Sequence, residues 1–242
     1  MKKNVLFWVG IKSENPHLRE KHGDFKYLDI SKPCWEWWCK KNDVVFFPYE
    51  KTTESDTNAH KATWQRWFDV FKQVEEAGID YDKIAVIDGS TLIRWDTPNF
   101  FKLCTEQVTA FRSLENLRWI TESVDGYNDF FNNFEFDMKK YISCGFQIFD
   151  KRHKKFLEKL KEFYFENYDS IMDLQNNKVG KGTDQPVYNY MLQMNDVKVG
   201  TIPPSFMLTH LNRFDWFGHN WQLKDNTSFF IKYGYIWFYS GF

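Results

Sequence analysis

Paired cysteines, long apolar runs and a dominant charge are all missing from this sequence of 242 residues. The four cysteines, Cys34, Cys39, Cys104 and Cys144, form no Cys-x-x-Cys pair, so their spacing argues against a zinc site. No apolar run approaches the ~20 residues that a membrane-spanning helix needs. The net charge of −1 gives the chain as a whole no electrostatic footprint for nucleic acid. Nothing at its start resembles a signal peptide, and we expect a protein of the reducing cytoplasm.

Aromatic residues, in contrast, are abundant and make up 20% of the chain. Two interpretations stay open, and both can hold at once: a core in which Phe replaces Leu, or a cleft whose rings stack on sugars or bases. A hydrophobic content of 43% with 27% charged residues argues against long disordered segments. The length suits one domain over residues 1–242.

Apolar runs alternate with amphipathic segments along the chain. Strands are predicted over 5–11, 43–47 (closed by Pro48) and 84–87, with further candidates over 118–122, 141–149 and 229–239. Helices are predicted over 35–41, 59–77 (stopped by Gly78), just after Pro98, from a cap at Asp150 to about 167, and over 184–194. Loops are expected over 12–24 and 126–137. This alternation predicts an α/β fold: one Rossmann-like domain with a mostly parallel central sheet flanked by helices.

Asp88 comes directly after the apolar run 84–87 and is the first candidate site residue. In such sheets ligands bind beyond the carboxyl ends of the strands, which draws attention to the residues just after Ile11, Ile87 and the 141–149 strand. A carboxylate there suits Mg²⁺ or Mn²⁺ that neutralises a diphosphate, and Ser90 comes two residues later. The alternative role for Asp88 is to cap the turn after the strand.

Two later segments carry polar or small residues at positions where a ligand fits. Asp184 and Gln185 stand where a glycine-containing loop enters a helix, and they either cap that helix or face a polar ligand. Gly145 interrupts the 141–149 strand, which indicates a bulge or the close approach of another group, such as a sugar ring.

These three segments, in this order and spacing, resemble GT-A glycosyltransferases, the class that contains glycogenin and bacterial lipopolysaccharide galactosyltransferases. The segment Asp88-Gly89-Ser90 resembles the family's Asp-x-Asp, which binds a divalent cation and the donor diphosphate. Residues 143–148, with Cys144 and Gly145 at the centre, resemble its Asn-x-Gly strand. Asp184-Gln185 resembles its late Asp-Gln pair, and the match covers roughly residues 1–200.

The resemblance implies a GT-A enzyme that moves a sugar from a nucleoside-diphosphate donor, with a UDP-sugar favoured, to a glycan or other hydroxyl acceptor. It implies that Asp184 and Gln185 act as catalytic residues facing the transferring sugar. The donor-binding residues that it implies are Gly10, Ile11, Lys12, Arg66, Asp88, Gly89, Ser90, Cys144 and Gly145. Within this set, a guanidinium at Arg66 suits phosphate through paired hydrogen bonds.

Two departures from the family pattern concern the metal. Ser90 stands in place of the second acid of Asp-x-Asp, and Phe238 stands where a late metal-binding His is expected. His210 and His219 are the remaining late candidates. We expect a divalent cation, Mn²⁺ or Mg²⁺, held by Asp88 and His210. Weak binding through water, metal-free donor binding and weakened catalysis stay open as alternatives.

A basic run over residues 151–155 begins one predicted helix. A solvated helix face is the simpler interpretation, but positive charge at a helix start opposes the helix dipole and leaves contact with an anionic acceptor open. A transferase that modifies hydroxylated bases in DNA is therefore one alternative, although nucleic acid is not the favoured partner. A non-catalytic module that binds a nucleotide sugar is the other. A hydrolase is disfavoured because the sequence has no Ser-His-Asp elbow or His-rich metal motif.

Overall fold

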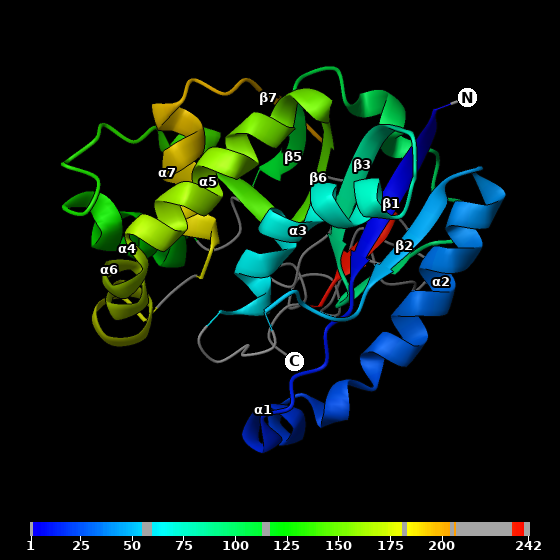
Figure 1. Cartoon of the computed structure of the whole chain (residues 1–242), viewed down its shortest axis with the longest axis horizontal. Helices are drawn as coiled ribbons and strands as arrows, with labels where there is room; N and C mark the ends of the chain where they lie inside the picture. Colours follow the sequence, from blue (N-terminus) through cyan, green and yellow to red (C-terminus); the bar gives the residue numbers. More distant parts are fainter. Residues whose placement is uncertain are drawn as a thin grey trace, which may run out of the picture.

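A six-stranded sheet forms the centre of the molecule (Figure 1). The computed structural model describes residues 2–54, 60–112, 117–180, 183–203, 206 and 234–239. In spatial order the strands are β2 (Val45–Tyr49), β1 (Lys3–Val9), β3 (Tyr81–Asp88), β6 (Ile142–Asp150), β5 (Val108–Arg112) and β7 (Val199–Thr201). Strand β6 runs antiparallel to β3 and β5, and the other pairings are parallel. The predicted α/β class with a mostly parallel sheet is confirmed.

Helices cover both faces of this sheet. In Figure 1, α3 and α5 cross in front of it and α2 runs beside β2. One face carries α3 (Ala62–Glu76), α4 (Leu117–Asn128), α5 (Lys154–Glu166), α6 (Tyr168–Asp173) and α7 (Gln185–Met194). The other carries α1 (Pro16–Lys21), α2 (Tyr27–Lys41) and an antiparallel pair, β4 (Thr91–Ile93) with β8 (Ile236–Phe238). The described ranges also contain short helical turns: 3-10 helices Gly23–Phe25, Phe100–Leu103, Met138–Lys140 and Lys151–His153, and a π-helix Leu174–Lys178.

The sheet separates two hydrophobic cores, to which alternate residues of each strand contribute. Val5 and Phe7 of β1 face the first core, whereas Leu6 and Trp8 face the second. Because successive side chains of a strand point to opposite faces, a strand buried on both faces is apolar throughout. Both cores are rich in rings, and most of the largest fully buried side chains are Trp and Tyr. Much of the aromatic content therefore serves to fill the interior.

Residues 118–122, predicted as a strand, lie in helix α4. Ile120, Val124 and Tyr127 are buried and recur at spacings of four and three, so a helix buries them on one face. The loop predicted over 126–137 accordingly begins inside the last turn of α4. The sequence pattern also misses β5 and α6.

Pro48 lies inside β2, although the sequence predicts that it ends the strand. Among the described strands β2 pairs with β1 alone, and an edge strand tolerates a residue that lacks an N–H. The loop predicted over 12–24 contains α1, whose first N–H groups are capped by the side chain of Asn15. The helix predicted over 35–41 is the second half of α2, which continues through Pro33.

Other predicted elements are found close to their expected bounds. The 59–77 helix is α3, and Gly78 comes after it with φ +71°, in the left-handed region that favours glycine. The Asp150 carboxylate caps the turn before α5 by accepting from the N–H of Arg152, as predicted. After Pro98 there is only a short 3-10 helix, which Asn99 caps. Of the 229–239 strand, the structure describes residues from 234, which include β8.

No helix in the described ranges combines the length and the apolar character needed to cross a membrane.

Candidate functional site

The ends of β1 and β3 meet the beginning of β6 at one edge of the sheet. Val9 pairs with Asp88, and Ile87 pairs with Phe146, so Gly145 comes next to the end of β3. Because β6 is antiparallel, its beginning lies at this edge, and the residues after its end lie at the opposite one. The carboxyl end of the 141–149 strand therefore lies at the edge opposite Asp88, contrary to the prediction of a shared edge, while Cys144 and Gly145 lie at the same edge as Asp88.

Arg66 joins the end of β3 to the start of α7. Arg66 lies in α3. Its Nη1 donates to Oδ1 of Asp88, and its Nη2 donates to Oδ2 of Asp184 at 2.9 Å. The indole Nε1 of Trp67 donates to the same oxygen of Asp184 at 2.6 Å. The side chains of Arg66 and Asp184 are 4% and 3% exposed, whereas that of Asp88 is 24% exposed. Two acids that are far apart in sequence thus share one buried guanidinium.

Asp88, Arg66 and Asp184 form a trio in which two carboxylates are buried around one cation, and this arrangement determines the electrostatics of the site. Burial raises the pKa of Asp88 to about 6, with Asp184 adding to the rise and Arg66 opposing it. Burial alone lowers the pKa of Arg66, but the two carboxylates outweigh it and raise that pKa above its ordinary value. The guanidinium stays charged, and with both acids ionised the trio carries a net charge of −1.

Asp184 and Gln185 do not cap helix α7 with their side chains. Asp184 occupies the N-cap position without a capping hydrogen bond, and its carboxylate is bound to Arg66, Trp67 and the hydroxyl of Thr183. Gln185 accepts from the backbone N–H of Cys144 at 2.9 Å. These contacts attach the start of α7 to both α3 and β6.

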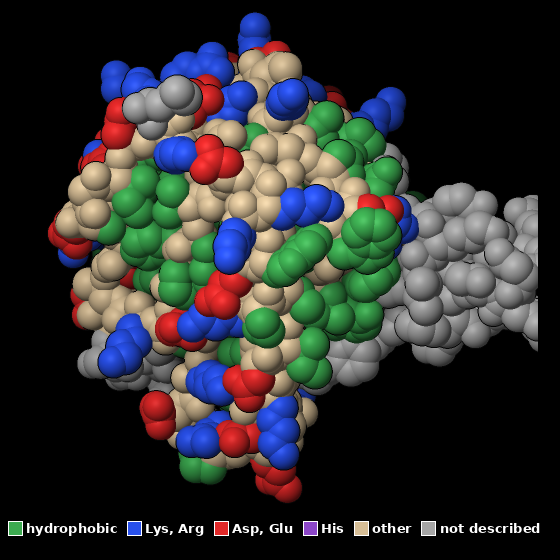
Figure 2. All heavy atoms as spheres, turned by 90° about the vertical axis from the view of Figure 1, so that its right-hand side faces the viewer, with side chains coloured by type: hydrophobic (Ala, Val, Ile, Leu, Met, Phe, Trp, Pro, Cys, Tyr) green, Lys and Arg blue, Asp and Glu red, His purple; other side chains and the backbone are tan. Residues whose placement is uncertain are grey.

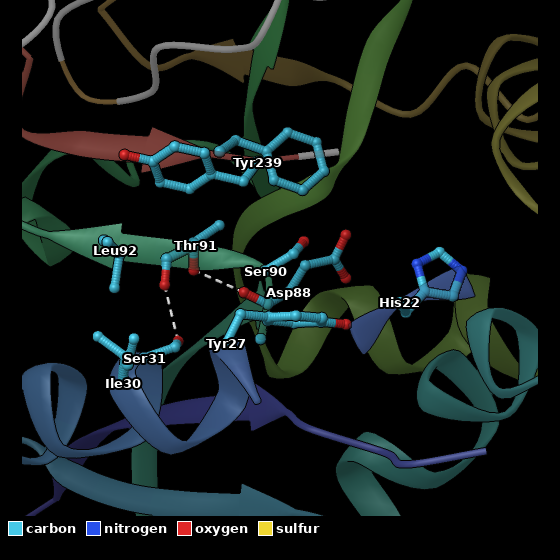
Figure 3. A pocket seen from close by; sticks show the side chains of 11 residues that line it. His22, Tyr27, Ile30, Ser31, Asp88, Ser90, Thr91, Leu92 and Tyr239 are labelled. Carbon is cyan, nitrogen blue, oxygen red and sulfur yellow. Dashed lines mark hydrogen bonds between the residues drawn. The ribbon is translucent and has the colours of Figure 1, made fainter. Parts of the chain in front are cut away.

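A cavity of about 470 Å³ opens beside Asp88 (Figure 3). Its lining residues come from the end of α1, the start of α2, the turn from β3 into β4, and the end of β8: His22, Tyr27, Ile30, Ser31, Asp88, Gly89, Ser90, Thr91, Leu92, Phe238 and Tyr239. In Figure 3 the rings of Tyr27 and Tyr239 lie on opposite sides of the Asp88 and Ser90 side chains. Asp184 and Gly145 are buried and do not line this cavity.

The turn that carries Asp88 is held on several sides. Gly89 donates its N–H to the carbonyl of Val9 at 2.8 Å, and a Cβ at Gly89 would lie 2.7 Å from that oxygen, so only glycine fits. The hydroxyl of Thr91 donates to the carbonyl of Asp88 at 2.5 Å. The N–H of Tyr239 donates to the carbonyl of Ser90 at 2.9 Å, which places the end of β8 over the turn.

The residues after β1 lie near this turn but do not line the cavity. Gly10 is close to Gly89, since a Cβ on Gly89 would approach the Cα of Gly10 to 3.3 Å. Ile11 packs against the first core, and the Nζ of Lys12 is 3.1 Å from a carboxylate oxygen of Asp29. None of these three predicted donor contacts lines the cavity: Gly10 lies next to the turn, whereas Ile11 belongs to the core on the other face of the sheet.

A divalent cation does not fit the side chains that the structure describes here. Within the described ranges, no three His, Cys, Asp or Glu side chains are grouped as a metal site. Asp88 is bound to the Arg66 guanidinium, Ser90 offers a neutral hydroxyl, and the carbonyl of Ser90 accepts from Tyr239. His210 and His219, the predicted late ligands, lie outside the described residues.

The basic run at 151–155 is largely paired. Lys151 lies 3.7 Å from Asp80, and Lys154 lies 2.7 Å from Glu75. Arg152 pairs with Asp150, and His153 is fully buried. On the face that Figure 2 shows, Lys and Arg side chains are interspersed with Asp and Glu, and hydrophobic side chains lie between them. Neither observation favours a surface of one charge.

Sequence reasoning missed several residues of this region. Trp67 is recognisable only as an apolar position of an amphipathic helix, and nothing marks its indole N–H as a partner of Asp184. Tyr27 belongs to no motif, and Tyr239 is marked only as the residue after Phe238, where a late His is expected; their places beside Asp88 depend on how α2 and β8 pack. Arg66 is a predicted donor contact, but its pairing with Asp88 and Asp184 has no local sequence signal.

Comparison with known proteins identifies the fold. Neither a protein-family model nor a curated protein sequence matches the chain. A glycosyltransferase involved in the glycosylation of the major capsid of PBCV-1 has a similar structure, with a TM-score of 0.61 and 10% identity, over 99% of this chain and 94% of that one. The galactosyltransferase LgtC, solved with donor and acceptor sugar analogs, gives a TM-score of 0.52 and 14% identity, over 98% of this chain and 87% of that one. The chain therefore has the GT-A-like fold of nucleotide-sugar glycosyltransferases.

Proposed function

We propose that this protein is a glycosyltransferase that moves a sugar from a nucleoside-diphosphate donor, in the first instance a UDP-sugar, to a glycan or other hydroxyl acceptor. The observation that carries the proposal is the bridge of Arg66 between Asp88 and Asp184. It brings together the two acids that the family resemblance singles out, within a fold that glycosyltransferases share.

The cavity beside Asp88 is the proposed site of the nucleoside. Ligand pockets are mostly apolar with a few polar groups that fix orientation, and this cavity is lined by aromatic rings together with the polar side chains of Asp88 and Ser90. A base stacks on a tyrosine ring, and ribose hydroxyls donate to the Asp88 carboxylate. Gly10, Ile11 and Lys12 remain proposed donor contacts on the β1 side.

The transferring sugar is proposed to lie between the trio and the start of β6. Gln185 faces it, Gly145 leaves room for its ring, and Asp184, whose carboxylate is buried against Arg66, Trp67 and Thr183, acts on it through Arg66. In the reaction the bond from the anomeric carbon to the diphosphate breaks, the acceptor oxygen bonds to that carbon, and the acceptor proton is released. Negative charge develops on the departing diphosphate, and the catalyst must stabilise it. Arg66 is a fixed cation at this site, and its Nε has no hydrogen-bond partner among the described residues.

The proposal is tested by donor hydrolysis and sugar transfer in Asp88→Asn and Asp184→Asn, with and without Mn²⁺. Removing a group that stabilises the transition state costs on the order of 10²–10³ in turnover. Asp173→Asn, which changes an exposed acid paired with Lys178 at the end of α6, is the matched control and should keep wild-type turnover. Equal activity in all three variants would remove both acids from the mechanism.

The two alternatives predict different outcomes in the same experiments. A transferase acting on DNA requires salt-sensitive duplex binding, which the paired charges of residues 151–154 do not favour. A non-catalytic module predicts tight binding of a nucleotide sugar with no turnover in the wild-type chain.

A further inference from the structure

We propose that nucleotide binding at this site needs no divalent cation, because Asp88, the carboxylate that lines the cavity, is already paired with the buried guanidinium of Arg66. The inference rests on the proposed function and extends it, since it concerns how the donor is held. It departs from the expectation, based on the resemblance, that Asp88 is a metal ligand.

The first argument is that Arg66 cannot easily leave Asp88. The guanidinium is 4% exposed and is held from its other side by Asp184 at 2.9 Å. Breaking one contact of a buried ion pair leaves an uncompensated charge, which is strongly unfavourable. A metal ion bound to the same carboxylate would also lie close to the guanidinium and be repelled by it.

The second argument concerns the other ligands within reach. Two residues after Asp88 the side chain is the hydroxyl of Ser90, and the Ser90 carbonyl accepts from the N–H of Tyr239 at 2.9 Å. At the end of β8, the cavity is lined by the rings of Phe238 and Tyr239, neither of which is a usual ligand of Mg²⁺ or Mn²⁺. The described residues offer such an ion one carboxylate, and that carboxylate is already paired.

The third argument is that Asp88 can bind a ligand directly, by accepting hydrogen bonds. A carboxylate fixed by a guanidinium still accepts hydrogen bonds through its remaining lone pairs. The Asp88 side chain is 24% exposed and lines the cavity together with Ser90. This pair of groups suits the hydroxyls of a ribose or sugar, which need no cation to bind.

The test is calorimetric titration of UDP, GDP and CMP into the whole protein, in EDTA and in Mn²⁺. We expect at least one nucleotide to bind with dissociation constants that agree within about twofold between the two conditions, which is ~0.4 kcal/mol. Binding that appears only with Mn²⁺, or tightens tenfold or more, would overturn the inference and leave the proposed function standing. No binding of any nucleotide in either condition would instead remove the proposed function, and this inference with it.

A second measurement detects the metal directly, by electron paramagnetic resonance of Mn²⁺. We expect no stoichiometric Mn²⁺ binding by the wild type, and measurable binding by Ser90→Asp, which restores a second acid. Thr105→Asp adds an exposed acid near the opposite edge of the sheet and should bind no more than wild type. Stoichiometric Mn²⁺ binding by the wild type that is lost in Asp88→Asn or His210→Ala would refute the inference.

Discussion

At the scale of single residues, the site depends on how one guanidinium is shared. Arg66 presents a planar fork of donors, and the fork allows separate nitrogens to bind Asp88 and Asp184 at the same time. A lysine at this position has one ammonium and no fork. The geometry therefore makes Arg66→Lys a severe change although it conserves the charge.

We predict that Arg66→Lys destabilises the fold by ~3 kcal/mol, because one buried carboxylate loses its partner. Donor binding should weaken as well, since Asp88 is then no longer fixed. Urea unfolding and nucleotide titration measure the two effects. Arg118→Lys changes an exposed pair with Glu122 and should alter stability by less than ~0.5 kcal/mol. A loss in Arg66→Lys no larger than in this control would contradict the buried bridge.

Trp67 and Trp64 provide a matched pair for a second prediction. Both are buried, but Trp67 donates its indole N–H to Asp184, whereas the Nε1 of Trp64 has no partner among the described residues. Trp67→Phe should lower stability by ~1–3 kcal/mol more than Trp64→Phe does, because it removes a hydrogen bond to a charged group. It should also reduce kcat more than it raises KM, since Asp184 is held less firmly. Equal effects on stability and kcat in the two variants would count against a positioning role for Trp67.

The sequence identifies the individual acids of the site better than their partners. Asp88 is marked by the apolar run before it, and Asp184 by the loop-to-helix boundary, because both signals are local. The contact of each with Arg66 depends on how α3 packs across the sheet, and no spacing along the chain encodes that contact. The same holds for Tyr27, whose place in the cavity depends on where α2 begins.

At the scale of elements, a chain of buried hydrogen bonds joins the start of α5, α7 and β6. Gln107 lies 3.2 Å from Nδ1 of His153, whose Nε2 lies 2.8 Å from the hydroxyl of Tyr188. That hydroxyl donates to Gln147 of β6 at 2.6 Å. Only a neutral imidazole, with the proton on Nε2, satisfies every partner, because Nδ1 must accept from the amide of Gln107.

This network makes stability depend on pH. Burial lowers the pKa of His153 to about 3, so between pH 3 and 6.5 the unfolded chain binds a proton that the folded chain does not. The contribution of His153 to stability should therefore fall as pH decreases through this window, by ~2 kcal/mol between pH 7 and pH 5, while Asp88, whose pKa is raised in the folded state, contributes a change of the opposite sign. His153→Gln removes the titrating group and should flatten this part of the profile. Urea unfolding at several pH values measures the free energy of unfolding of the wild type and the variant. Identical slopes of this free energy against pH in the two proteins would contradict the prediction.

The elements themselves were predictable where their periodicity is long. Helix α3 carries four turns of an amphipathic pattern, and β3 ends in an unbroken apolar run, so both can be inferred from the sequence. Strand β5 is short and carries Thr109 and Arg112 among its five residues, so no pattern marks it. The reversed direction of β6 is also invisible, because a strand buried on both faces has the same apolar pattern in either direction.

At the scale of the whole molecule, the fold is shared with solved glycosyltransferases at only 10–14% identity. Ligand binding is therefore a sharper test of the proposed function than the fold is. A ligand that binds only the folded state adds RT ln(1 + [L]/Kd) to its stability, or ~2.7 kcal/mol at a hundredfold excess. For a chain of this length that corresponds to a rise in Tm of about 5–10 °C. We predict such a rise with one class among UDP-, GDP- and CMP-sugars.

Two variants test whether the ligand-induced rise in Tm comes from binding in the cavity beside Asp88. Asp88→Asn should abolish most of the ligand-induced shift, because the proposed ribose contact is lost at a side chain that is partly exposed. Asp173→Asn should keep the whole shift, since this acid is exposed and paired with Lys178 away from the cavity. A shift that survives in Asp88→Asn at the wild-type size would place the nucleotide elsewhere on the molecule. The cavity between α2 and the β3–β4 turn would then have to bind something other than the donor.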